Sequence, residues 1–145
     1  MSQARRRARQ AAVQAVYQWQ MTQQNIGDID AQFRQEHAGT KTDVEYFERL
    51  LRGVTTSIDE LDELFSPYMA RGKDDIGPVE KAVLRVATYE LKYVLDVPYR
   101  VVINEAIDLG KRFGADKAHK FINGVLDKVV LDTRQVEINA SKRKK

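Results

Sequence analysis

The sequence contains no cysteine, only two histidines and three prolines, and no long apolar run. The absence of cysteine excludes disulfide bonds, thiolate chemistry and cysteine-ligated zinc. His37 and His119 are far apart and lack the spacing of metal ligands, so we expect no metal site and no cofactor. Because no stretch of about 18 apolar residues occurs, no membrane span is predicted, and the basic start lacks the apolar segment of a secretory signal. We expect a cytoplasmic protein.

Motifs typical of enzymes are also missing. There is no G-x-x-x-x-G-K-[ST] phosphate loop, no G-x-G-x-x-G after a strand and no G-x-S-x-G nucleophile elbow. Carboxylates are abundant, but no pair can be placed in a shared apolar pocket, so a general acid–base site has no support. We therefore expect no catalytic residue and no enzyme activity.

Charge is distributed unevenly along the chain. Eight of the 24 basic residues lie in Arg5–Arg9 and Lys142–Lys145, and neither segment contains an acid. The rest of the chain therefore has more acidic residues, 21 in number, than basic ones. This asymmetry indicates a polyanion bound at the ends and acidic surface left for a basic partner. Solvated termini are the alternative, which explains the C-terminal tail better than the N-terminal cluster, because that cluster continues into a helix.

Helical periodicity dominates the rest of the sequence. Apolar residues recur at three- and four-residue steps, and no segment alternates with the period of a strand. Short connections favour antiparallel neighbours in small bundles. We predict an all-α fold of about seven helices, with a single domain at 1–135 and a basic, disordered tail at 136–145. The segment 79–95 is apolar on more than one face, so we expect this helix to be central.

Capping residues mark several of the expected helix ends. Asp43 is a suitable cap for the helix that follows it, and Pro78 stands at the favoured first position of another. Gly114 is expected to end the helix after Pro98 in a left-handed conformation. Asp116 is then expected to cap the last clear helix.

The last helix carries an aromatic residue on a basic face. On a helical wheel, Lys117, Phe121, Gly124 and Lys128 lie on one side, with Lys120 further round and the core stripe elsewhere. An aromatic ring among lysines can stack on splayed single-stranded bases within a positive field. The other interpretation is that Phe121 turns sideways into the core.

Three further groups of residues are candidates for binding. Arg6 and Arg9 fall with Tyr17 on one flank of the N-terminal helix, where arginines can follow a phosphate backbone. Phe113 and Tyr68 stand at helix ends, where they can stack on bases or cover the core. Seven acids form either a solvated helix face or a docking surface for a basic protein; they are Asp59, Glu60, Asp62, Glu63, Asp74, Asp75 and Glu80.

Two stretches resemble the NusB family of bacterial transcription antitermination factors: RRRARQAAVQAVYQWQ and VEKAVLRVATYELKYVLDVPYRVVINEAIDLGKRFGADKAHKFINGVLDKV. The resemblance extends from about Arg5 to Val130. It implies two small helical bundles sharing a core. It also implies binding of single-stranded boxA RNA from ribosomal RNA leaders, together with a small-subunit ribosomal protein called NusE, and entry into the RNA polymerase elongation complex with other Nus factors.

The resemblance also implies roles for single residues. It places RNA contacts at Arg5, Arg6, Arg7, Arg9, Tyr68, Phe113, Lys120 and Phe121, and contacts with the protein partner at Tyr17 and Glu80. The N-terminal region of a ribosomal RNA cytosine methyltransferase family also resembles NusB, so an enzyme's RNA-binding domain is an alternative. The chain lacks the parallel-sheet signals of a methyl-donor domain. A third alternative is a self-associating protein whose inactive homodimer covers the arginine surface.

Overall fold

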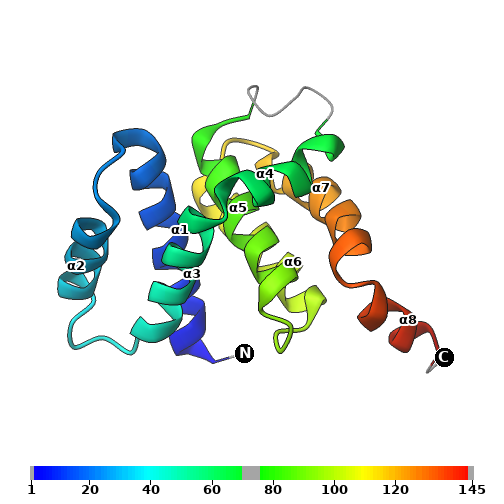
Figure 1. Ribbon diagram of the computed structural model, residues 1–145, viewed down its shortest axis with the longest axis horizontal. Coiled ribbons are helices and arrows are strands. Elements are labelled where there is room, and N and C mark those ends of the chain that lie inside the picture. Colours follow the sequence, from blue (N-terminus) through cyan, green and yellow to red (C-terminus); the bar gives the residue numbers. More distant parts are fainter. Residues whose placement is uncertain (1, 70–75, 144–145) are drawn as a thin grey trace.

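The computed structural model describes residues 2–69 and 76–143, which form eight α-helices and one short 3-10 helix (Figure 1). In chain order they are α1 (Gln3–Thr22), α2 (Ile26–Glu36), α3 (Val44–Thr56), α4 (Ile58–Phe65), η1 (Ser66–Tyr68), α5 (Pro78–Tyr93), α6 (Tyr99–Phe113), α7 (Ala118–Thr133) and α8 (Gln135–Arg143). The all-α prediction is confirmed, with one helix more than expected. Among the described residues, no helix is long and apolar enough to cross a membrane.

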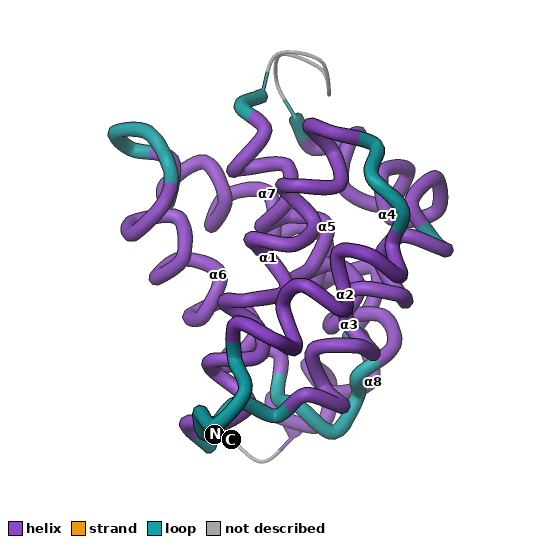
Figure 2. Tube along the Cα trace, turned by 90° about the vertical axis from the view of Figure 1, so that its left-hand side faces the viewer, coloured by secondary structure: helices purple, strands orange, loops and turns teal. Residues whose placement is uncertain are grey.

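The helices form two small bundles that share one core. Helices α1, α2 and α3 pack together on one side, and α4, α6 and α7 surround α5 on the other (Figures 1 and 2). Helix α5 also contacts α1 and α3, so it belongs to both bundles. The prediction of two bundles with a shared core is confirmed.

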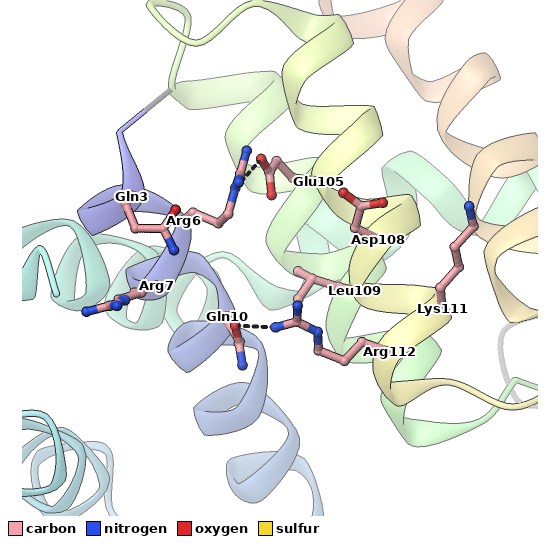
Figure 3. A pocket seen from close by; sticks show the side chains of 9 residues that line it. All are labelled: Gln3, Arg6, Arg7, Gln10, Glu105, Asp108, Leu109, Lys111 and Arg112. Atoms are coloured by element: carbon pink, nitrogen blue, oxygen red, sulfur yellow. Dashed lines mark hydrogen bonds and ion pairs between the residues drawn. The ribbon is translucent and has the colours of Figure 1, made fainter. Parts of the chain in front are cut away.

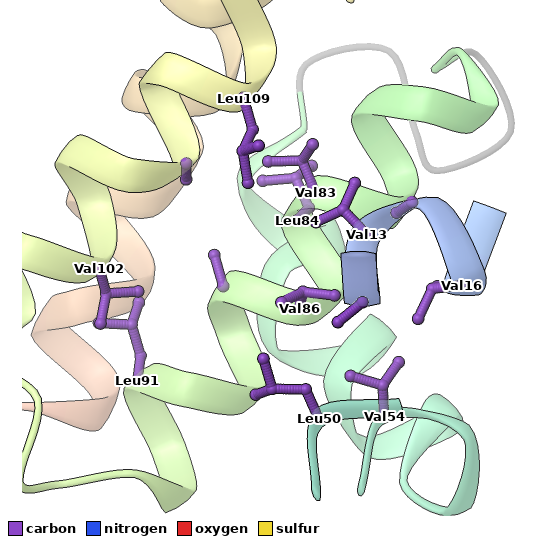
Figure 4. Close-up of a cluster of buried hydrophobic side chains, with 14 of the residues drawn as sticks. Val13, Val16, Leu50, Val54, Val83, Leu84, Val86, Leu91, Val102 and Leu109 are labelled. Carbon is purple, nitrogen blue, oxygen red and sulfur yellow. The ribbon is translucent and has the colours of Figure 1, made fainter. Parts of the chain in front are cut away.

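Helix α5 is central because its sequence is apolar around most of its circumference. Leu84 and Leu91 are fully buried on one side of it, and Val83 and Val86 are almost as deep on another (Figure 4). Burying one such side chain contributes roughly 1.5–3 kcal/mol. Several neighbouring helices therefore gain stability by packing on α5, as its pattern predicted.

Helix α3 follows its sequence signals closely. The side chain of Asp43 accepts a hydrogen bond from the Tyr46 backbone N–H at 3.0 Å, which caps the first turn as predicted. Phe47, Leu51 and Val54 lie on one stripe and are buried. Helix α3 therefore turns this stripe towards α1 and α5.

The turn between α6 and α7 differs from both capping predictions. Gly114 is extended, with φ −85° and ψ 172°, and the left-handed residue is Lys117, with φ 65°. Lys117 precedes the first residue of α7, so Asp116 does not cap that helix. Glycine is required at position 114 for space, because a Cβ there would lie 2.7 Å from the Ala118 Cβ.

The expected disordered tail is also corrected, because α8 occupies Gln135–Arg143. The preceding Arg134 is 3% exposed, and its guanidinium donates to the carbonyl oxygens of Leu91 at 2.6 Å and Val97 at 2.9 Å. It also binds Glu137 Oε1 at 2.5 Å, in the first turn of α8. The buried Arg134 thus provides hydrogen bonds for carbonyl oxygens at the end of α5 and holds the start of α8. The polar composition of this segment did not indicate that role.

Candidate nucleic-acid interface

The basic start of α1 presents two exposed arginines to one side of the molecule. Ser2 caps the helix, and its hydroxyl accepts from the Arg5 N–H at 3.2 Å. Ala8 and Ala12 bury the opposite face against the core. Arg6 and Arg7 therefore remain at the surface.

Arg6 and Arg7 line a groove of about 480 Å³ between α1 and α6 (Figure 3). Two hydrogen bonds cross it: Arg6 Nε donates to Glu105 Oε1 at 3.0 Å, and Arg112 Nη1 donates to Gln10 Oε1 at 2.9 Å. The groove is lined by Gln3, Arg6, Arg7, Gln10, Glu105, Asp108, Leu109, Lys111 and Arg112. It therefore combines a positive rim with two carboxylates and an apolar side chain.

Arg9 does not belong to this surface, which corrects the prediction that it contacts RNA. Its side chain is 2% exposed, and it donates to both carboxylate oxygens of Glu90, at 2.6 and 2.5 Å. Tyr46 donates to the same carboxylate at 2.5 Å. Burial on its own lowers the pKa of Arg9, but the hydrogen bond and charge of Glu90 outweigh it, so this pKa lies above its ordinary value. Arg9 is an ion-paired core residue.

Arg5 points to a different side of α1. Its guanidinium carbon lies 4.4 Å from the centre of the Tyr46 ring, and its Nη1 lies 3.3 Å from Asp96 Oδ2. The side chain is 31% exposed, so it remains accessible. The structure therefore separates Arg5 from the pair Arg6 and Arg7, although all three are adjacent in sequence.

Helix α7 carries the predicted aromatic and basic face. Lys120 and Lys128 are exposed, and so is Lys117 just before the helix. Phe121 is half-buried, with one side against the core and the rest open to solvent. A Cβ on Gly124 would meet no atom within 4 Å, so the backbone is accessible there. Phe121 is thus partly packed against the core and partly exposed beside the lysines.

Tyr68 and Phe113 are half-buried at the edges of this face. The Tyr68 hydroxyl donates to Asp132 on α7, and this hydrogen bond raises the pKa of Tyr68 above its ordinary value. Eleven residues separate Phe121 from Asp132, roughly 16 Å along a helix. The rings of Tyr68 and Phe121 therefore stand near opposite ends of α7.

Lys111 and Arg112 were missed by the sequence reasoning. They occupy the last turn of α6, where cations are favourable, directly before Phe113. Both line the groove; in Figure 3 Arg112 points towards Gln10 on α1, whereas the Lys111 side chain extends away from α1. Because α6 also packs on α7, these residues lie between the groove and the α7 face. The signal that could have identified them in the sequence is the basic pair itself, which stands shortly before the segment GADK.

The predicted protein-partner residues are only partly accessible. Tyr17 is 37% exposed on α1. Glu80 is 9% exposed and accepts from the Ala115 N–H at 3.1 Å, so it holds the α6–α7 turn and offers little surface to a partner. Asp74 and Asp75 lie outside the described residues. Of the other acids, Asp62 pairs with the buried Arg85 at 2.8 Å.

Two small helical bundles that share α5 and bring an arginine-bearing helix beside a basic helix end define a NusB-like class of fold. The model of the NusB family matches residues 6–131 of the sequence. This chain belongs to the NusB family.

Similar proteins agree with this assignment. The transcription antitermination protein NusB of Colwellia psychrerythraea strain 34H is 58% identical over 126 residues, covering 87% of this chain and 91% of that protein. The Shewanella halifaxensis protein of the same name is 52% identical, covering 90% and 96%. T. maritima NusB superposes with a TM-score of 0.80 at 31% identity, covering 96% of this chain and 99% of that one. A crystal structure of the antitermination factors NusB and NusE in complex with double-stranded RNA gives a TM-score of 0.82 at 28% identity, covering 91% and 99%.

Proposed function

We propose that this chain is a cytoplasmic, non-enzymatic transcription antitermination factor. It binds boxA-type single-stranded RNA of ribosomal RNA leaders together with the ribosomal protein NusE, and joins the RNA polymerase elongation complex with other Nus factors. The observation that carries the proposal is the half-buried Phe121 among exposed lysines on α7. A large aromatic ring that is partly open between cations can stack on an unpaired base within a positive field.

The RNA backbone and the bases are held by different groups. Arg6, Arg7, Lys111 and Arg112 provide cations for phosphates along the groove and its rim. Phe121 provides a ring on which an unstacked base can lie. This division explains why the site uses both the start of α1 and the pair α6 and α7. The cations position the RNA strand, and the ring favours single-stranded segments.

The NusE surface is proposed around Tyr17. Met21, one turn further along α1, is 57% exposed, so two large side chains are open there. Asp59 and Glu63 on α4 are also exposed and provide negative charge for a basic protein. This surface is separate from the groove, whose lining ends at Gln10 on α1. RNA and protein can therefore bind at the same time.

Equilibrium binding to fluorescently labelled RNA tests the proposal. The probes are a boxA-type single strand, the same bases scrambled, and the boxA strand annealed to its complement, each with and without NusE. We expect the boxA single strand to bind most tightly and its affinity to fall as salt rises, because neutralised phosphates release counterions. Equal affinity for all three probes would contradict the proposal. Sedimentation of the same samples identifies a homodimer that RNA dissociates.

Phe121→Ala is the matched variant for this experiment. It should lower affinity for the boxA strand by about 1–3 kcal/mol, the usual contribution of one stacked base. Phe121→Leu keeps apolar packing against the core but removes the aromatic face, so it should lose most of the same affinity. If both variants fold and bind like the wild type, stacking on Phe121 has no role.

A further inference from the structure

The groove between α1 and α6 contains two carboxylates that phosphate binding does not require. Glu105 is 8% exposed, and Asp108 stands almost one turn further along α6. A site built only for phosphates gains nothing from acids, because like charges repel. Glu105 already uses one oxygen to accept from Arg6, and a ligand group that donates hydrogen bonds can use the other.

Glu105 is well placed to accept such a bond. One of its oxygens accepts from Arg6 Nε at 3.0 Å, and the other points into the groove (Figure 3). The Arg6 side chain is 53% exposed and that of Glu105 is 10% exposed, so the arginine lies over the groove while the carboxylate lies at its floor. The pair thus combines an outer cation with an inner acceptor.

The cations on both sides determine which part of a nucleotide reaches Glu105. Arg6 and Arg7 lie on the α1 side, and Arg112 lies on the α6 side. If successive phosphates bind to these cations, the sugar between them lies over the groove. The ribose 2′-hydroxyl is the donor at that position that distinguishes RNA from DNA.

We propose that Glu105 accepts a hydrogen bond from the 2′-hydroxyl of one nucleotide seated in the α1–α6 groove, and that this contact makes the groove selective for RNA over DNA. The proposal rests on the proposed RNA-binding function and adds a residue that reads the sugar. Leu109 at the same floor provides apolar contact for the ribose ring. Arg6 holds the Glu105 carboxylate in place and binds phosphate with its remaining N–H groups.

A walk of single 2′-deoxy substitutions along the boxA-type strand tests this contact. With the wild-type protein, one position should lower affinity about tenfold or more, the usual effect of losing one hydrogen bond to a charged group. With Glu105→Met, which removes both acceptor oxygens at similar length, the same deoxy substitution should change affinity less than twofold. The contact is then shown by the loss of coupling, not by affinity alone.

Two controls separate this contact from general effects of charge and stability. Glu105→Gln keeps one acceptor oxygen and should retain part of the deoxy penalty. Asp127→Asn removes an exposed acid on α7, outside the groove lining, and should leave the penalty at its wild-type size. Thermal unfolding of each variant establishes that the binding samples are folded.

The possible outcomes are distinct. If the wild type binds the boxA strand but no deoxy position matters, or if the penalty is the same in Glu105→Met, the inference is overturned and the proposed function stands. A lower affinity of Glu105→Met for every strand without any coupling indicates a base donor and also overturns it. If the wild type does not bind the RNA strand, the proposed function itself fails.

Discussion

Arg9 and Glu90 form a buried ion pair with two parallel hydrogen bonds, 2.6 Å from Nε to Oε1 and 2.5 Å from Nη2 to Oε2. The pair joins α1 to α5 in the centre of the molecule. It fixes the rotation of α1 about its axis, and this rotation determines which neighbouring arginines face solvent. Arg9 therefore acts on the candidate interface by positioning Arg6 and Arg7.

Arg9→Gln should lower the free energy of unfolding by about 3–5 kcal/mol, because Glu90 would remain buried without its cationic partner. Urea denaturation followed by circular dichroism measures the change. Arg7→Gln is the matched control at an exposed position, where we expect less than about 0.5 kcal/mol. RNA affinity measured on folded protein should show the opposite order, with Arg7→Gln lowering it more than Arg9→Gln. A mild effect of Arg9→Gln on stability would contradict the structural role given to this pair.

Tyr46→Phe tests the same buried group through its pH dependence. Burial and the Glu90 carboxylate raise the pKa of Tyr46 above its ordinary value. A raised pKa in the folded state stabilises the protein below the unfolded pKa of about 10, and this contribution is lost as the pH rises above it. The wild type should therefore lose stability more steeply than Tyr46→Phe above about pH 10. Parallel curves for the two proteins would exclude this contribution.

Gly124→Ala should separate stability from binding. The added methyl group meets no atom within 4 Å, and alanine is favoured over glycine inside a helix by about 1 kcal/mol. The variant should melt at a higher temperature. If RNA approaches the backbone at Gly124, its affinity should nevertheless fall. A variant that is more stable and binds RNA as well as the wild type would show that the strand does not touch this part of α7.

Lys111→Gln tests the RNA-binding role of Lys111, one of the two residues that were not predicted from the sequence. Loss of one phosphate contact should reduce the slope of log affinity against log salt by about 0.7, the value for single strands. Lys41→Gln removes an exposed lysine near the start of α3, away from the groove, and should leave the slope unchanged. Equal slopes for the wild type and both variants would place Lys111 outside the RNA path.

Periodicity predicted the helices and most of the core, because the stripes of α3 and α5 are local properties of the sequence. It could not distinguish Arg6 from Arg9. Both lie on one flank of α1, and their different fates depend on Glu105 and Glu90, which lie 99 and 81 residues away in the chain. Long-range partners of this kind have no signature in helical spacing.

The turn before α7 and the C-terminal segment were predicted incorrectly for a related reason. Gly114 suggested a left-handed cap, but it is needed because Ala118 packs against it. Residues 136–145 were expected to be a disordered tail, yet α8 covers most of them, and the Arg134 side chain just before it donates to carbonyl groups at the end of α5. In both places the residue type indicated a special position, but the contact that requires this residue type is made with a neighbouring helix.

Photo-crosslinking of the chain to boxA-type RNA in the presence of NusE, with crosslinked residues identified by mass spectrometry, tests the central claim most directly. The account predicts crosslinks at the start of α1, at the end of α6 and on α7, with Phe121 among them. Crosslinks confined to α2 and α3, with none on α1, α6 or α7, would contradict it.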